Sequence, residues 1–178
     1  MADIRDLVTE DRGIIKKVQA FLPGYKKYRN CVDLRSADNL LRIELAKKLK
    51  MVEMNISAAR EELARKMDLD NITILGELAN RAHTLTEKVK HAEQGYAPWI
   101  SGDVRIEEDE LKMLYDYDLA MFEGAEKLVA TSRSLNELAT GNGGNLREMV
   151  KSIQNHIADY DRTFSERISK VTKVAQER

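Results

Sequence analysis

The chain has 178 residues, of which 43% are hydrophobic and 33% charged, and its formal net charge is −1. Size and composition are typical of one soluble domain with its own core, so residues 1–178 are treated as a single domain. The balanced charge gives no general attraction to nucleic acid, and a single cysteine excludes an internal disulfide. No signal peptide and no apolar run of about 20 residues is present, so we expect a cytoplasmic protein without integral membrane association.

The first predicted helix covers residues 4–22. Its apolar face consists of Ile4, Val8, Ile15, Val18 and Leu22. Asp11 interrupts this face, and Pro23-Gly24 ends the helix because proline cannot continue it and glycine accepts a left-handed turn.

The second predicted helix, at about residues 28–67, has the longest apolar repeat in the chain. Steps of three and four residues join Leu34, Ala37, Leu41, Leu45, Leu49, Val52, Ile56, Ala59, Leu63 and Met67. Such a repeat predicts a helix about 50 to 60 Å long, which only an elongated bundle can cover.

The third predicted helix, at residues 71–96, has the 3.5-residue period of coiled-coil packing. Its apolar face consists of Leu75, Leu78, Ala82, Leu85, Val89, Ala92 and Tyr96. Asp70 is the predicted N-cap, and Leu69 and Ile74 have the spacing of a hydrophobic staple. The period predicts left-handed packing against long neighbouring helices.

Two further helices are predicted at residues 107–139 and 145–176. The first has the face Leu111, Leu114, Asp118, Met121, Ala125, Leu128, Ser132 and Leu135, and the second Leu146, Val150, Ile153, Ile157, Tyr160, Phe164, Ile168, Val171 and Ala175. Asn145 and Glu148 form a predicted capping box at the start of the last helix. The chain is therefore predicted to be all-α, an elongated antiparallel up-and-down bundle of four long helices with the N-terminal helix as a fifth.

Aromatic and charged residues are predicted to gather at one end of this bundle. Folding the third helix back on the second brings Tyr96 level with Arg42, because the two residues are equally far along the chain from the turn at Leu69. The candidate binding residues at this end are Tyr25, Tyr28, Arg35, Asp38, Arg42, Tyr96, Trp99, Tyr115 and Asp118. The second helix extends beyond the third at this end, and the connection that contains Trp99 has to cover its apolar surface. Trp99 is therefore predicted to be at least half buried against the second helix.

Several of these residues belong to short patterns: Leu22-Pro23-Gly24-Tyr25 with Tyr28, Arg35-x-x-Asp38-x-x-Leu41-Arg42, Gly95-Tyr96-Ala97, and Leu114-Tyr115-x-x-Asp118. Together they resemble an uncharacterised family of small helical-bundle proteins from prokaryotes, over roughly residues 22–123. This chain departs from that family at Lys27, where a second glycine would be expected, and at 30–32, where a charged run is usual. The resemblance implies a fold but no activity.

No catalytic or metal-binding pattern is present. A di-iron bundle needs Glu-x-x-His on two helices, and Asn80, Lys88 and Ile153 occupy the matching positions before the histidines. Cys31 has no histidine nearby in sequence, and the GNGG loop at 141–144 joins two helices without a preceding strand. We therefore expect no metal, no cofactor and no enzymatic activity.

Charge is unevenly distributed, with eight basic and three acidic residues from Tyr25 to Lys50 but nine acidic and two basic from Ser101 to Glu126. The two segments are expected to face each other, and the acidic one opposes nucleic-acid binding at the tyrosine-rich start of the second helix. A protein–protein interaction or assembly module, which could pair as a homodimer, is the favoured function. The alternative is a small anionic-ligand-binding or sensing bundle with its pocket at the Tyr28/Arg42/Trp99 end.

Asp118 gives the sharpest structural prediction, because it lies in the centre of an apolar face. A carboxylate there should be buried and paired, since an unpaired buried charge is too costly to keep. Counting along the helices favours Arg42 as its partner, with Lys48 and Lys50 as alternatives.

Overall fold

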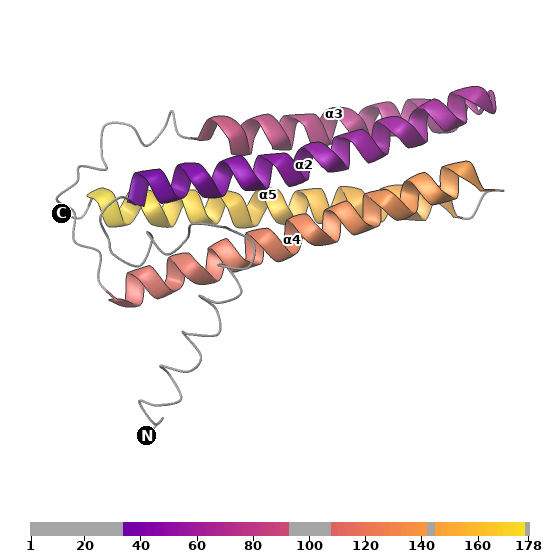
Figure 1. Ribbon diagram of the computed structural model, residues 1–178. Helices are drawn as coiled ribbons and strands as arrows, with labels where there is room; N and C mark the ends of the chain where they lie inside the picture. The colour runs from indigo at the N-terminus through magenta and orange to yellow at the C-terminus, as the bar shows by residue number, and fades with distance from the viewer. Residues whose placement is uncertain (1–33, 93–107, 142–144, 177–178) are drawn as a thin grey trace, which may run out of the picture.

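The computed structural model describes residues 34–92, 108–141 and 145–176, and within these ranges it contains four α-helices and no strand (Figure 1). The helices are α2 (Leu34–Arg65), α3 (Leu69–His91), α4 (Glu108–Thr140) and α5 (Leu146–Gln176). The predicted all-α class is therefore confirmed. The predicted helix at 4–22 and the predicted helix ends at 28–33 and 93–96 lie outside the described residues.

The predicted apolar faces form the core. The buried members are Leu41, Leu45, Leu49, Val52, Ile56, Ala59 and Leu63 of α2, Leu75, Leu78, Ala82, Leu85 and Val89 of α3, Leu114, Met121, Ala125, Leu128 and Leu135 of α4, and Leu146, Val150, Ile153, Ile157, Tyr160 and Phe164 of α5. These side chains line the length of the bundle, and their steps of three and four residues are the reason each helix presents one continuous face to the others.

The helices form two antiparallel hairpins, α2–α3 and α4–α5, which pack side by side (Figure 1). Across the two hairpins, α2 packs against α4 and α3 packs against α5. The α2–α4 pair is parallel: Lys48 pairs with Glu126 near the middle of each helix, and the Asn55 amide donates to the Ser132 hydroxyl farther along both helices.

The order of the helices around the bundle departs from that of a simple up-and-down bundle. Successive helices run antiparallel, as predicted, but α3 and α4 lie on a diagonal of the bundle instead of side by side. A simple up-and-down bundle would place them in contact. The connection between them, residues 92–107, has more residues than a tight turn needs, so its length permits a diagonal crossing.

The α2–α3 turn differs from the prediction in its cap. Met67 adopts a left-handed conformation, with φ of 60°, and Asp68 N donates to Leu63 O at 3.0 Å in the arrangement of a Schellman motif. The Asp68 side chain then accepts from Asn71 N, so Asp68, not Asp70, is the N-cap of α3. Because the left-handed residue turns the chain away from the core, Met67 is exposed instead of buried.

The predicted staple is wrong for the same reason. With Asp68 as the N-cap, the positions of a staple fall one residue before it and at Ile72, and Leu69 is already helical and largely exposed.

At the end of the bundle that contains the α2–α3 turn, side chains form hydrogen bonds with backbone groups at the helix ends. Lys66 Nζ donates to the last two carbonyls of α4, those of Ala139 and Thr140, at 2.7 and 3.0 Å, and to the carbonyl of Gly141 just after the helix at 2.7 Å. A cation suits this position because the C-terminal carbonyls of a helix lack partners and carry its negative dipole end. At the start of α5, Glu148 N donates to Asn145 Oδ1, which confirms the predicted N-cap.

Candidate functional site

The predicted binding residues divide into three groups. Tyr25, Tyr28, Tyr96 and Trp99 lie outside the described residues, and Arg35 and Asp38 belong to α2 but their side chains are not described. Arg42, Tyr115 and Asp118 are all buried. The predicted burial of Trp99, and the ligand pocket that depends on it and on Tyr28, stay predictions.

Asp118 is buried and paired, as predicted. Its side chain has 0% exposure and that of Arg167 has 2%, and Arg167 Nε donates to Asp118 Oδ1 at 2.7 Å. This ion pair joins α4 to α5 inside the core. A buried pair of this kind holds the register of two helices, because a shift of either helix would separate the charges.

The prediction named the wrong basic residue for this ion pair. It considered cations from the second helix alone, whereas Asp118 faces Arg167 in its own hairpin. The signal was available in the sequence: Asp118 lies nearly as far before Gly141 as Arg167 lies after Asn145, so folding α5 back on α4 places the two charges level. Arg167 also continues the alternation of Tyr160 and Phe164, where the predicted face took Ile168 instead.

Arg42 lies on α2, and its side chain is buried against the end of α3. Its Nη1 donates to Lys90 O at 3.3 Å, so the guanidinium caps a carbonyl in the last turn of that helix, a favourable place for a cation. This hydrogen bond ties α2 to the end of α3, and a role of Arg42 in ligand binding stays a prediction.

Tyr160 lies one heptad before Arg167 on the same helix. Its hydroxyl is buried and has no hydrogen-bond partner among the described residues, and its ring lies 3.1 Å from where a Cβ on Gly124 would stand. Burial raises the pKa of the Tyr160 phenol far above its ordinary value, and the positive charge of Arg167 opposes this rise only in part. Tyr160 stays a neutral core residue.

A second polar cluster joins α2 to α3. Glu53 is mostly buried, and its Oε2 accepts from Lys50 Nζ at 2.7 Å and lies 3.4 Å from His83 Nδ1. Burial raises the pKa of the Glu53 carboxyl, but hydrogen bonds from Lys50, Thr86 and His83 outweigh it and leave the pKa below its ordinary value. The carboxylate is held charged in a site that stabilises the hairpin.

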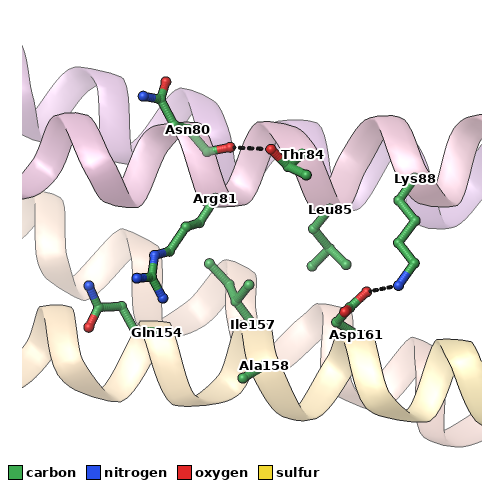
Figure 2. Close-up of a pocket in the computed structure, with 9 residues that line it drawn as sticks. All are labelled: Asn80, Arg81, Thr84, Leu85, Lys88, Gln154, Ile157, Ala158 and Asp161. Carbon is green, nitrogen blue, oxygen red and sulfur yellow. Dashed lines mark hydrogen bonds and ion pairs between the residues drawn. The ribbon is translucent and has the colours of Figure 1, made fainter.

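A shallow groove of about 480 Å³ runs between α3 and α5 (Figure 2). Leu85 and Ile157 form its floor, and a salt bridge between Lys88 and Asp161 closes one end. The Arg81 side chain reaches toward α5 and makes no hydrogen bond or ion pair with the described part of the chain. The floor residues are only 4% and 7% exposed, so the groove offers little apolar surface to a partner.

The outer face of α2 offers much more apolar surface. Ile43, Met51 and Met54 are 45%, 44% and 63% exposed, and Leu40 is also exposed. Together with Lys47 these residues follow one another at steps of three or four, so they share one side of the helix, turned away from the core. We call Leu40, Ile43, Lys47, Met51 and Met54 the α2 outer stripe. Sequence reasoning missed it because only the longer, core-facing repeat of this helix was followed.

In residues 34–92, 108–141 and 145–176, no group of three or more His, Cys, Asp or Glu side chains is placed to hold a metal ion. Within the same ranges no helix is both long and apolar enough to cross a membrane.

The fold and these surfaces define a four-helix bundle whose most apolar exposed face, among the described residues, is the α2 outer stripe. No protein-family model, curated protein or solved structure matches this chain.

Proposed function

We propose that this chain is a non-enzymatic, cytoplasmic protein–protein interaction module that docks an amphipathic helix on the α2 outer stripe. The observation that carries the proposal is the exposure of Ile43, Met51 and Met54 in one line along a helix. Methionine is unbranched and polarisable, so such a line adapts to a partner helix more readily than one of branched residues.

The length of the stripe suits a helical partner. From Leu40 to Met54 it extends over about 21 Å along the helix axis, at a rise of about 1.5 Å per residue. A helix of about four turns laid along this line would cover all its apolar side chains, whereas the α3–α5 groove, with its buried floor, would gain little from the same partner.

The charge in the middle of the stripe selects the partner. Lys47 lies between two apolar pairs, and its side chain is 65% exposed beside Glu44 of the same helix. Two α2 stripes related by a twofold axis would place Lys47 against the Lys47 of the other copy, and like charges at the centre of an apolar contact oppose association. The favoured partner is therefore an amphipathic helix with an acidic residue at its centre.

A pair of synthetic peptides tests this proposal. Both are amphipathic helices with leucines at alternating steps of three and four residues, and they differ in one central residue, glutamate or lysine. Fluorescence anisotropy should show tighter binding of the glutamate peptide to the full chain, by about two- to fivefold for one exposed charge pair. Lys47→Glu should reverse that order, and Met54→Glu should weaken both peptides.

A matched control is Ala64→Glu, which places a charge on an exposed position of the same helix almost three turns beyond Met54, outside the stripe. It should leave binding unchanged. Equal binding of both peptides, or binding that ignores Met54→Glu, would contradict the proposal.

A further inference from the structure

We propose that the α3–α5 groove binds a small organic monocarboxylate, whose carboxylate is held by Arg81 and Gln154 at one end of the groove. This site lies on other helices than the α2 outer stripe, so it adds a ligand to the protein–protein interaction and does not depend on it. Three observations carry the proposal: a guanidinium without a partner, the register of α3 and α5, and the size and charge of the groove.

Arg81 places an uncompensated positive charge in the groove. Figure 2 shows its side chain extending from α3 toward α5, on the side of the groove where Gln154 lies. Within the part of the chain that the structure describes, neither the Arg81 guanidinium nor the Gln154 amide makes a hydrogen bond or an ion pair. A guanidinium presents its N–H donors in a planar fork, and carboxylates and phosphates are the anions that accept two parallel hydrogen bonds from it.

The neighbouring salt bridge indicates which group Arg81 lacks. Lys88 on α3 pairs with Asp161 on α5, and Arg81 and Gln154 lie one heptad before them on the same two helices. Because α3 and α5 run in the same direction, Gln154 lies opposite Arg81 as Asp161 lies opposite Lys88. Glutamine has the size of glutamate but carries no charge. A bound carboxylate would supply the negative charge that this position leaves out.

The size of the groove suits a small organic molecule. Its volume of about 480 Å³ lies within the range of about 300 to 1,000 Å³ that is typical of small-molecule sites. The two polar ends of the groove are about 10 Å apart along the helix axes, at a rise of about 1.5 Å per residue. Leu85 and Ile157 lie between these ends and form a short apolar floor, on which the hydrocarbon part of a ligand would rest.

The charge of the groove selects a monoanion. Arg81 and Lys88 are positive and Asp161 is negative, so the lining carries an excess of one positive charge. One carboxylate balances this charge, whereas the Asp161 carboxylate opposes the second negative charge of a phosphate dianion. Because the floor side chains are already largely covered, the hydrocarbon part adds little free energy of binding, and we expect a dissociation constant in the millimolar range.

A titration of the full chain with benzoate tests this site. Chemical shifts of the backbone amides and of the Arg81 Nε–H group are recorded at constant ionic strength. Saturable changes are expected at Arg81, Leu85 and Gln154. Benzamide, which has the same ring without the charge, should bind about fivefold more weakly or less, as expected when a charge-assisted pair is lost, and inorganic phosphate should also bind more weakly than benzoate.

Two substitutions separate the site from a general effect of charge. Arg81→Gln removes the cation, and Gln154→Glu supplies the missing carboxylate within the chain, so each should weaken benzoate binding by about fivefold or more. Gln154→Glu retains Arg81 and adds an ion pair between α3 and α5, so its melting temperature should not fall. The matched control is Arg133→Gln, which removes an exposed arginine from α4, diagonal to α3, and should leave benzoate binding unchanged.

Four results would overturn the site. They are the absence of saturable shifts at Arg81, equal binding of benzoate and benzamide, undiminished benzoate binding in Gln154→Glu, and shifts centred on Arg42 instead of the groove. Tighter binding of phosphate than of benzoate would overturn the assignment of a monocarboxylate. None of these results affects the docking proposal, which is tested at Leu40 to Met54.

Discussion

Replacing Asp118 by alanine should destabilise the bundle by about 3 to 5 kcal/mol, the range for breaking one partner of a buried ion pair. This loss is large for a single substitution. It is expected here because both side chains are almost fully inaccessible to solvent and the Nε–Oδ1 distance is 2.7 Å. At an effective dielectric constant of about 20, two charges about 4 Å apart attract by about 4 kcal/mol. Alanine removes that attraction and leaves the Arg167 Nε without its carboxylate.

Urea unfolding followed by circular dichroism measures this loss. The matched control is Asp161→Ala, which breaks the exposed Lys88–Asp161 pair between α3 and α5 and should cost under about 1 kcal/mol. The double variant Asp118→Leu/Arg167→Met should lose less stability than the sum of the two single variants, because it leaves no charge stranded. A loss below about 1 kcal/mol for Asp118→Ala, or strict additivity in the cycle, would refute the reasoning.

Three further predictions concern the ends and the second polar cluster of the bundle. Met67→Gly should raise the free energy of unfolding by about 0.5 to 1 kcal/mol in urea, because glycine adopts the left-handed conformation without steric cost; a lower stability would contradict this. Lys66→Met should lower the melting temperature because the three carbonyls at the C-terminal end of α4 lose their donor, an effect of about 1 kcal/mol, and Arg65→Met should change it less. The folded-state pKa of Glu53 is lowered, so its charged form stabilises the fold above the unfolded pKa of about 4.3, and that contribution disappears as pH falls. The stability difference between wild type and Glu53→Gln should therefore be greatest near neutral pH and vanish in acid; a difference that persists at low pH would exclude this origin.

The core could be predicted from the sequence because it depends on local periodicity. Steps of three and four residues place Leu45, Leu49 and Val52 on one face whatever the neighbouring helix is. The same periodicity predicted the burial of Asp118, since a residue in the middle of an apolar helix face is buried together with the apolar residues around it.

The neighbours of each helix could not be predicted in the same way. Periodicity says which face of α4 is buried but not whether α3 or α2 covers it, and the connection at 92–107 is long enough to allow either. The prediction considered only α2, which does pack against α4, and left out α5, the helix that supplies Arg167. Arg167 escaped notice because a charged residue in an apolar repeat resembles a break in the repeat, although Asp118 has the same character on α4.

The prediction of the α2–α3 turn was wrong for a different physical reason. A methionine in the left-handed conformation is uncommon, so Met67 carried no sequence signal for the end of the helix, in contrast to the glycine that usually occupies that place. This unexpected turn moved the cap from Asp70 to Asp68 and exposed Met67.

The α2 outer stripe as a helix-docking surface is tested most directly by mapping where the glutamate peptide binds. Backbone amide chemical shifts of the full chain, recorded with and without the peptide, should change along Leu40 to Met54 and remain unchanged around Arg81 and Lys88 in the α3–α5 groove. The same spectra of Met54→Glu should show little change in either place. Shifts centred on Arg81 and Lys88, with α2 unaffected, would contradict the account.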